Sequence, residues 1–331
     1  MSGKKLACLI YGQEMHYIDH LAPLAYFFKI PLITSDVDVE STLKEFYPEV
    51  TSYWIDPLRL PAYLSKGYDG IISCMPKSYV DSLLFPSSIK KRPIFFFCPH
   101  GNSDKKNLRL LAQETHVFVY GEQMRTRLKG GKKTFLFFLG DYRRQYYQEQ
   151  KLFYRKILSR FLPQNRKQTP SFFYAPTWED YENNFSLERG EKLIASFPKN
   201  YDLLVKVHPN TYLKEELTLL RWKYFYAKPN IYFLENIPVV YPILEKVDGY
   251  IGDGSSIGYD ALLLKKSLFF FTKKRKRALF PYGKMLSMQR IKEDLDAKDG
   301  VSSEKKRAFV DHVFQKNVCL KSLKKEVYLS L

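Results

Sequence analysis

The chain alternates strand-sized apolar runs with helix-length polar segments, and this rhythm restricts the possible folds more than any other feature. Six apolar runs occur between residues 5 and 140, namely KLACLIYG, IPLITS, GYDGIISCM, RPIFFFCPHG, THVFVYG and KTFLFFLG. Runs that are apolar throughout indicate strands of a parallel sheet buried on both faces. The segments between several of them are long enough for covering helices, so the pattern predicts an α/β fold.

A basic stretch at residues 142–170 interrupts this rhythm, and its polar end, QNRKQTP, is typical of a linker. Five more strand candidates then follow as SFFYAPT, DLLVKVHPN, NIYFLEN, DGYIGDG and KSLFFFT, with a helix at ALLLKK. A chain of 331 residues is long enough for two domains. We therefore predict two Rossmann-like domains, residues 1–165 and 166–331, with the last helix able to pack back on the first domain. Ligands in such sheets bind beyond the carboxyl ends of the strands, which directs attention to a cleft between the two halves.

Composition narrows the class of protein. The apolar runs are strand-sized and too short to span a membrane, and no signal peptide is evident at the start. Four scattered cysteines form no CxxC pair, so we predict neither a disulfide framework nor a metal site. These features favour a soluble intracellular protein in a reducing compartment.

Two histidines stand where a predicted strand ends, one in each half. His100 follows RPIFFFCP, and His208 follows DLLVKV. Histidine suits proton transfer near neutral pH and also hydrogen-bonds phosphate, so both are candidate catalytic residues. His16 and His20 lie at helical spacing without an evident third metal ligand, and we expect them at a helix surface or core edge. The remaining two, His116 and His312, are expected to be structural.

The segment GDGSS joins a predicted strand to a predicted helix and suits an anion. Ser255 or Ser256 is placed to cap the helix, and Gly254 allows a ligand to approach the backbone. The first turn of a helix offers unpaired N–H groups, so the segment is a candidate phosphate cradle. A dinucleotide fingerprint is not supported, because the glycine spacing is wrong and the basic run KKRKR follows where an acidic residue is expected. We therefore expect no NAD and no other cofactor.

Four motifs in order add a resemblance to a known family. PHGNSDKK, FFYAPTWED, LLVKVHPN and GDGSSIGYDALLLKKSLFFF resemble the CDP-glycerol glycerophosphotransferases, the enzymes of teichoic-acid-type polymers. The resemblance extends over roughly residues 95–275. It implies a GT-B fold with an acceptor-side N-terminal domain and a donor-binding C-terminal domain. Gly254 departs from the family pattern, which has Tyr at that position.

The resemblance implies a transfer from CDP-glycerol or a similar CDP-alcohol to a hydroxyl of a cell-envelope glycolipid or polymer. His100 would take the proton of the acceptor, while His208 and the Ser255–Ser256 helix start would hold the diphosphate. The remaining implied contacts are a phosphate contact at Thr177, a weaker one at Lys206, and a ribose or glycerol contact at Asp260. Packing at the strand end would explain Thr177 as well as a phosphate contact does. A favourable interaction with the helix dipole would explain Asp260 as well as a ligand contact does.

A net charge of +18 points to a polyanionic partner. We expect the protein on the cytoplasmic face of an anionic membrane, attached through the basic run at 273–277 or an amphipathic helix around 153–162. Two other classes stay open. One is a GT-B glycosyltransferase or UDP-sugar 2-epimerase, and the other is a non-catalytic polyanion binder. The sequence contains no nucleic-acid-binding motif, so nucleic acid is not the partner we expect.

Overall fold

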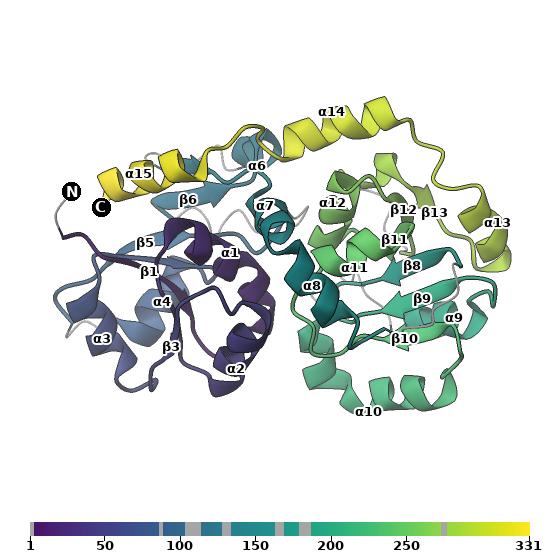
Figure 1. Ribbon diagram of the computed structural model, residues 1–331, viewed down its shortest axis with the longest axis horizontal. Coiled ribbons are helices and arrows are strands. Elements are labelled where there is room, and N and C mark those ends of the chain that lie inside the picture. The colour runs from purple at the N-terminus through teal and green to yellow at the C-terminus, as the bar shows by residue number, and fades with distance from the viewer. Residues whose placement is uncertain are drawn as a thin grey trace. The chain divides into compact units, whose positions relative to one another are not determined.

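The computed structural model describes residues 3–85, 89–102, 114–127, 134–162, 169–178, 187–272 and 277–331. The chain divides into two compact units (Figure 1). Unit 1 comprises Met1–Glu149 and Asp311–Leu331, and unit 2 comprises Gln150–Val310. Each unit is built around one sheet of parallel strands. The α/β class predicted from the alternating runs is therefore confirmed.

The described strands of unit 1 form a seven-stranded sheet in the order β3-β2-β1-β4-β5-β6-β7. Their bounds are β1 Leu6–Ile10, β2 Leu32–Thr34, β3 Ser52–Trp54, β4 Gly70–Ser73, β5 Ile94–Phe97, β6 His116–Val119 and β7 Phe135–Phe138. All five residues of β1 are buried, because β1 is a central strand with helices over both faces. The chain reverses its direction of travel across the sheet between β1 and β4, which makes this the switch point of unit 1.

Helices flank this sheet and contribute the rest of the core. They are the short 3-10 helix η1 Met15–Tyr17 and the α-helices α1 Ile18–Phe28, α2 Val37–Phe46, α3 Leu60–Gly67, α4 Lys77–Leu84, α6 Glu122–Arg127, α7 Tyr142–Glu149 and α15 Leu320–Ser330. One core cluster joins α3 and α4 to the central strands through Leu60, Leu64 and Val80.

The C-terminal segment belongs to unit 1. Helix α15 packs against α1 and β7. The N–H of Gln315 donates to the carbonyl of Tyr120 over 2.8 Å. A Cβ atom on Gly121 would lie 2.5 Å from the Val313 carbonyl oxygen, and one on Gly140 would lie 2.6 Å from that of Gln315. The returning backbone therefore rests directly on two glycines of unit 1.

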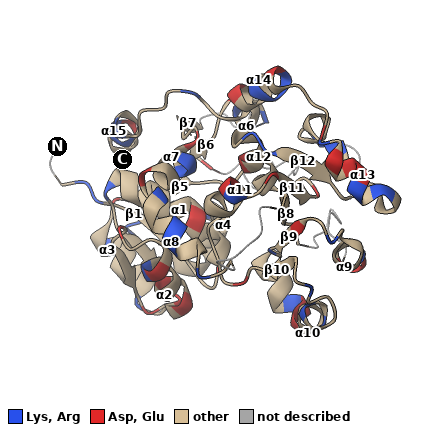
Figure 2. Ribbon diagram, turned by 45° about the vertical axis from the view of Figure 1, so that its right-hand side comes forward, with Lys and Arg blue, Asp and Glu red and all other residues tan. Residues whose placement is uncertain are grey.

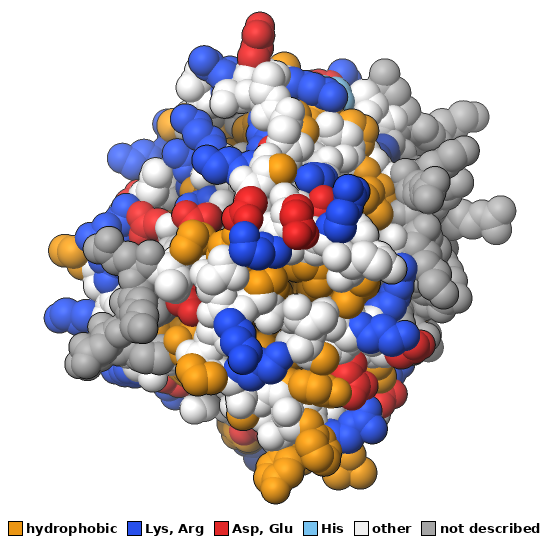
Figure 3. Space-filling view, turned by 90° about the vertical axis from the view of Figure 1, so that its right-hand side faces the viewer, with side chains coloured by type: hydrophobic (Ala, Val, Ile, Leu, Met, Phe, Trp, Pro, Cys, Tyr) orange, Lys and Arg blue, Asp and Glu red, His pale blue; other side chains and the backbone are white. Residues whose placement is uncertain are grey.

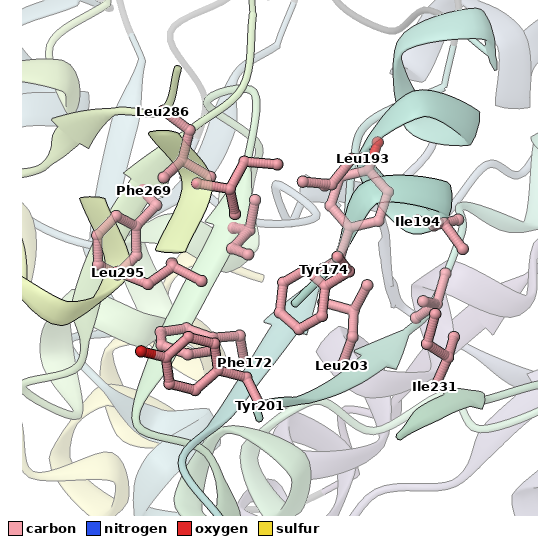
Figure 4. Close-up of a cluster of buried hydrophobic side chains, with 14 of the residues drawn as sticks. Phe172, Tyr174, Leu193, Ile194, Tyr201, Leu203, Ile231, Phe269, Leu286 and Leu295 are labelled. Atoms are coloured by element: carbon pink, nitrogen blue, oxygen red, sulfur yellow. The ribbon is translucent and has the colours of Figure 1, made fainter. Parts of the chain in front are cut away.

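Unit 2 has a six-stranded sheet in the order β10-β9-β8-β11-β12-β13 among its described residues. The bounds are β8 Ser171–Tyr174, β9 Asp202–Val205, β10 Ile231–Phe233, β11 Gly249–Gly252, β12 Ser267–Phe270 and β13 Lys284–Met285. The helices are α8 Lys151–Leu158, α9 Leu187–Ser196, α10 Pro209–Phe225, α11 Tyr241–Lys246, α12 Ser256–Leu263, α13 Ile291–Asp296 and α14 Ser303–Val313, with 3-10 turns η2 Phe280–Tyr282 and η3 Met288–Arg290. Figure 4 shows the core between the sheet and α9, where Phe172 and Tyr174 of β8 pack among Leu193, Ile194 and Leu203.

Two strands were absent from the prediction, and both are short edge strands. β3 is largely exposed and β13 has two residues, so neither carries an apolar run that sequence inspection detects. Most of the predicted linker at 164–170 and most of the basic run at 273–277 lie outside the described residues. Within the described residues, no helix is long and apolar enough to cross a membrane.

The predicted amphipathic helix corresponds to α8, and its apolar side is used inside the fold. α8 packs on α11, with Tyr154, Ile157 and Leu158 buried. Lys151 also forms an ion pair with Glu245 of α11. Because these buried side chains already have protein neighbours in unit 2, they are not available to a bilayer.

Candidate active site

The switch point of unit 2 lies between β8 and β11. From β8 the chain continues to β9 and β10 on one side, and it returns to β11, β12 and β13 on the other. The loops that leave the carboxyl ends of two such strands diverge and leave room for a ligand. Here these loops are Ala175–Trp178 after β8 and Asp253–Ser255 after β11. Both contain motif residues from the sequence analysis.

A buried carboxylate ties the two loops together. Asp253, 4% exposed, accepts hydrogen bonds from the backbone N–H of Thr177 over 3.1 Å and from its hydroxyl over 2.6 Å. Hydrogen bonds to an ionised acceptor are among the stronger ones in proteins. Since the single hydroxyl hydrogen of Thr177 is directed to Asp253, this arrangement uses Thr177 to position the loop rather than to donate to a phosphate.

The start of α12 leaves its first N–H groups without a side-chain cap. Ser255 occupies the N-cap position with extended backbone angles, yet its side chain makes no capping bond. The hydroxyl of Tyr250 donates to the carbonyl of Ala175 over 2.9 Å, so it accepts from the Ser255 hydroxyl, 2.8 Å away. Ser256 is the first residue of the helix and is half-buried. The helix start therefore presents backbone N–H groups and its positive dipole end, both of which favour an anion.

Gly254 shapes the approach to this helix. Its φ of +94° lies in the region that side-chain-bearing residues rarely adopt. A Cβ atom there would also lie 3.2 Å from Phe280 Cε1 and 3.3 Å from Arg277 Cγ. A residue with a side chain, such as the Tyr of the family pattern, would be strained in this backbone conformation.

His208 stands at the N-cap of α10. Its Nδ1 accepts a hydrogen bond from the backbone N–H of Asn210 over 3.1 Å. In the neutral ring this places the proton on Nε2, which then is a hydrogen-bond donor. The ring is half-buried and stacks at 29° on Trp178 of the β8 loop, with centroids 6.1 Å apart. Lys214 of α10 also approaches this ring, with its Nζ 4.9 Å from the centroid of Trp178.

Basic side chains gather at this edge of the sheet. Lys206 follows β9 and is half-buried. Arg189 of α9 lies with its guanidinium carbon 5.4 Å from the centroid of Phe271, directly after β12. Arg277 contacts the Gly254 turn. Arg277 therefore adds positive charge beside the turn that leads into α12, and this charge favours an anion there.

Asp260 occupies a different environment from the one expected of a ligand contact. Its side chain is buried, and it accepts a hydrogen bond from the Tyr241 hydroxyl over 2.8 Å. The pair joins α12 to α11. This hydrogen bond gives Asp260 a structural role, and the ribose or glycerol contact implied by the resemblance stays a prediction.

In unit 1 the structure brings His100 together with two residues that the sequence analysis set aside or passed over. His100 is exposed after β5, while His16 and Tyr17 lie in η1, after β1 at the switch point. The ring centroids of His16 and Tyr17 each lie 5.3 Å from that of His100. Glu14 lies 3.3 Å from His16 Nδ1. No spacing rule reveals this cluster, because His16 and His100 are 84 residues apart in the sequence.

A buried hydrogen-bond chain supports the His100 loop. The Tyr120 hydroxyl donates to the Pro99 carbonyl over 3.2 Å and accepts from His20 Nδ1 over 3.0 Å. Burial, together with the nearby charges of Arg143, His100 and His16, holds the pKa of His20 well below its usual range. His20 is therefore a neutral core residue, in keeping with the expected core edge. Among the described residues no group of acidic, histidine and cysteine side chains is arranged to hold a metal.

Comparison with known families agrees with the motifs. Residues 143–278 match the family described as CDP-glycerol:poly(glycerophosphate) glycerophosphotransferase. This segment contains the Thr177, His208 and Ser255 loops, whereas His100 lies before it. No curated protein sequence matches the chain at a significant level.

Solved structures match almost the whole chain. The wall teichoic acid polymerase TagF has a TM-score of 0.68 at 13% identity, over 98% of this chain and 89% of that one. A TagF variant soaked with CDPG has a TM-score of 0.64 at 15% identity, over 98% and 87% of the two chains. The UDP-GlcNAc 2-epimerase of Methanocaldococcus jannaschii has a TM-score of 0.65 at 13% identity, over 98% and 99%.

At these identities the solved structures show the fold. It is the two-sheet α/β fold that teichoic acid polymerases share with GT-B UDP-sugar epimerases, as predicted. The family match then separates these classes. It confirms the predicted resemblance and indicates an enzyme of the CDP-glycerol glycerophosphotransferase type.

Proposed function

We propose that this protein transfers a glycerophosphate-type group from CDP-glycerol or a similar CDP-alcohol to a hydroxyl of a cell-envelope glycolipid or polymer. The family match over residues 143–278 is the observation that carries the proposal. The fold alone supports a UDP-sugar epimerase equally well, since both classes have it.

Unit 2 binds the donor in this proposal. The N-terminus of α12, open to an anion beside Gly254, receives the diphosphate. His208 Nε2–H and the Lys206 ammonium add hydrogen bonds and positive charge at the neighbouring strand end. Ser256 contributes its backbone N–H. Ser255 and Thr177 act by holding the two loops in place, since their hydroxyl hydrogens are already donated to Tyr250 and Asp253.

The chemistry requires one base and one stabilised leaving group. His100 accepts the proton of the acceptor hydroxyl, and the acceptor oxygen attacks the phosphorus that bears the glycerol. The bond from that phosphorus to the bridging oxygen breaks, and CMP departs with the electron pair. Cations and N–H groups around the diphosphate stabilise the developing charge, which is the main protein contribution in phosphoryl transfer.

The protein is further proposed to work at the inner face of the cytoplasmic membrane. A lipid-linked acceptor would be found there, and the net charge of +18 favours an anionic surface. Co-sedimentation with phosphatidylcholine vesicles, with and without phosphatidylglycerol, tests this placement, and equal binding to both kinds of vesicle would contradict it.

Product release from a panel of nucleotide donors tests the activity. The purified protein is incubated with CDP-glycerol, CDP-ribitol and UDP-GlcNAc in the presence of a short glycerophosphate acceptor. We expect CMP release from a CDP-alcohol, with His100→Ala reducing the rate by about 10²–10⁴. Epimerisation of UDP-GlcNAc without CMP release would establish the rival enzyme class. No turnover of any donor, together with tight binding of polyphosphate, would favour the non-catalytic polyanion binder.

A further inference from the structure

A pocket opens on unit 1 at the amino ends of β1 and β4. It has a volume of about 480 Å³, and its lining residues are Lys5, Ala62, Tyr63, Lys66, Gly67 and Tyr68. Such a volume is typical of a site for a small ligand or for one unit of a longer one. His16 and His100 follow the carboxyl ends of β1 and β5, at the opposite edge of the same parallel sheet. The pocket is therefore separate from the candidate active site.

The ammonium groups of the two pocket lysines are available to a ligand. Lys5 and Lys66 are exposed, and among the described residues neither side chain forms an ion pair. Both oxygens of the neighbouring Asp69 are already engaged. Its Oδ2 accepts the backbone N–H of Lys5 over 2.8 Å, and its Oδ1 lies 3.7 Å from Lys91 Nζ. The charges of Lys5 and Lys66 are therefore left for an anion from outside the chain.

Other lysines of the protein do have carboxylate partners. Lys192 pairs with Glu188 on α9. Lys292 pairs with Asp296 on α13. Figure 3 shows such basic and acidic side chains next to one another on one face of the molecule. The pocket departs from this pattern, because its lysines have no such partner among the described residues.

Three basic segments that are far apart in the sequence meet around the pocket. They carry the lysine pairs at 4–5 and 90–91 and the single Lys66. The Asp69 N–H donates to the Lys5 carbonyl over 2.8 Å, and the Ser65 hydroxyl donates to the Lys91 carbonyl over 2.5 Å. Figure 2 shows the basic segment that leads from the N-terminus into β1 in blue. Like charges gathered on one surface repel one another, so this group favours a bound polyanion.

Two tyrosines give the pocket an apolar wall and hydrogen-bond donors. The ring centroids of Tyr63 and Tyr68 lie 5.9 Å apart, and the rings are tilted by 52°. Burial and the neighbouring Tyr63 raise the pKa of Tyr68, so its phenol stays protonated and can donate. The tilted rings form no parallel slot for a flat nucleobase, whereas the short carbon chain of a polyol can pack on either of them. Cations beside such rings suit a phosphate that carries a small polyol.

We propose that this pocket binds a glycerophosphodiester unit of an acceptor chain, with Lys5 and Lys66 on the phosphate and the two tyrosines against the glycerol. The choice of ligand rests on the proposed function, in which the acceptor can be a polymer. β1 has five residues, so the two edges of the sheet lie roughly 17 Å apart. A single glycerophosphate unit is much shorter than this distance. Only an acceptor of several units therefore contacts both the pocket and His100.

Binding of a soluble glycerophosphate oligomer without any donor tests the site. The oligomer carries a fluorophore, and its anisotropy is measured with the full chain. Lys5→Gln/Lys66→Gln is compared with Lys321→Gln/Lys325→Gln, whose lysines are exposed on α15 of the same unit and lie outside the pocket. Both double variants remove the same charge from unit 1, so a difference between them is not an effect of net charge. Circular dichroism confirms that they fold.

A second pair of variants changes the pocket without removing any contact. A Cβ atom on Gly67 would meet nothing within 4 Å, and the backbone there is not in the left-handed region. Gly67→Glu therefore adds a carboxylate to the pocket without crowding or strain, and Gly67→Ala is its uncharged control.

We expect Lys5→Gln/Lys66→Gln to bind the oligomer at least about tenfold more weakly than the wild type. The Lys321/Lys325 control should stay within about threefold of the wild type. Gly67→Glu should weaken binding and Gly67→Ala should not. Equal losses in the two double variants would overturn the proposal. So would a dependence on Lys5 and Lys66 that appears only with phosphatidylglycerol vesicles or only with single-stranded DNA.

Failure of the pocket and failure of the proposed reaction are distinguishable, because binding is measured without turnover. In the reaction, Lys5→Gln/Lys66→Gln should raise the KM of a long acceptor by about tenfold relative to that of a single-unit acceptor. If the oligomer binds through these lysines while no donor releases CMP, the pocket stands and the reaction falls. If CMP is released but oligomer binding ignores these lysines, the reaction stands and the pocket falls.

Discussion

The two ring nitrogens of His208 have separate tasks. Nδ1 accepts the N–H of Asn210 and so caps α10, and the neutral ring then carries its proton on Nε2. A structural role and the proposed donor-binding role would therefore share one side chain, and an alanine substitution would remove both. The two are separable, because asparagine also caps helices well but offers no donor at the position of Nε2.

We expect His208→Asn to keep the stability of the wild type and to lose activity. The turnover rate should fall by about 10²-fold, as for loss of one donor to a developing charge. His208→Ala should lose a similar amount of activity and also about 1 kcal/mol of stability through the missing cap. Steady-state kinetics and urea unfolding measure these quantities. Full activity of His208→Asn would show that Nε2 does not serve the donor.

Glu114 is a buried carboxylate with one N–H partner. Its Oε1 accepts the backbone N–H of Lys77 at the start of α4 over 2.6 Å, while Oε2 has no hydrogen-bond partner among the described residues. Burial raises its pKa to about 7, against the opposing effect of Lys77. A carboxyl whose pKa is higher in the folded state favours folding in its protonated form. The ionised form of Glu114 therefore destabilises the fold, and this destabilisation grows as the pH rises from about 4.5 to about 7.

Glu114→Gln should therefore stabilise the protein in a pH-dependent manner. Glutamine keeps an acceptor for the Lys77 N–H and carries no charge. Its gain in unfolding free energy over the wild type should be on the order of 1–2 kcal/mol larger at pH 8 than at pH 5. Chemical denaturation at the two pH values measures the difference. A gain that is independent of pH would mean that Glu114 titrates normally.

At the scale of elements, three helix starts differ in how side chains meet their first N–H groups. α10 is capped by His208, α4 receives the distant carboxylate of Glu114, and α12 has no side-chain cap because Ser255 bonds Tyr250. Only the last of these leaves its N–H groups to a ligand. The turn that leads into α12 depends on Gly254, whose backbone conformation excludes an ordinary side chain.

Gly254→Ala should lower both stability and donor affinity, and Gly300→Ala is the matched control. Gly300 also has a positive φ, +67°, but a Cβ atom there would meet nothing within 4 Å. Each substitution should cost about 1–2 kcal/mol of stability through backbone strain. Calorimetric titration with CDP should show weaker binding for Gly254→Ala alone. Equal affinity in both variants would place the diphosphate away from this turn.

At the scale of the molecule, the chain crosses from unit 1 to unit 2 near residue 150 and returns near residue 311. The returning segment completes the core of unit 1, where Val313 and Val327 are fully buried. The Leu331 side chain also reaches β4, since a Cβ atom on Gly70 would lie 2.4 Å from its Cδ2. Unit 2 contains all of its described donor-site residues without this segment.

Deleting residues 311–331 should therefore destabilise unit 1 selectively. Hydrogen exchange should increase in α1 and β7, which α15 covers, and much less in β8 and β11. CDP affinity should change by less than about threefold, because the donor loops belong to unit 2. A loss of CDP binding on deletion, with β8 and β11 still protected, would mean that the C-terminal segment takes part in the donor site.

The sequence by itself predicted two parallel sheets, the strands that form most of them, and the loops at their carboxyl ends. These features are local, because a buried strand is apolar throughout and a helix start after a strand requires glycine and small polar residues. His100, His208 and Gly254 were found in this way. The edge strands β3 and β13 were missed because their residues are exposed or few.

The partners of each side chain were decided by the tertiary structure. Asp253 accepts a hydrogen bond from Thr177, which lies 76 residues earlier in the chain. The Ser255 hydroxyl, which the sequence predicted as a helix cap, donates to Tyr250 instead. His16 joins His100 because the strands β1, β4 and β5 are neighbours in the sheet. On α10, Leu213 and Leu217 are exposed while Leu219 and Trp222 are buried, a division that the sequence analysis did not predict. Strand order and burial act over long sequence distances, so local patterns do not encode which of two apolar helix faces remains in solvent.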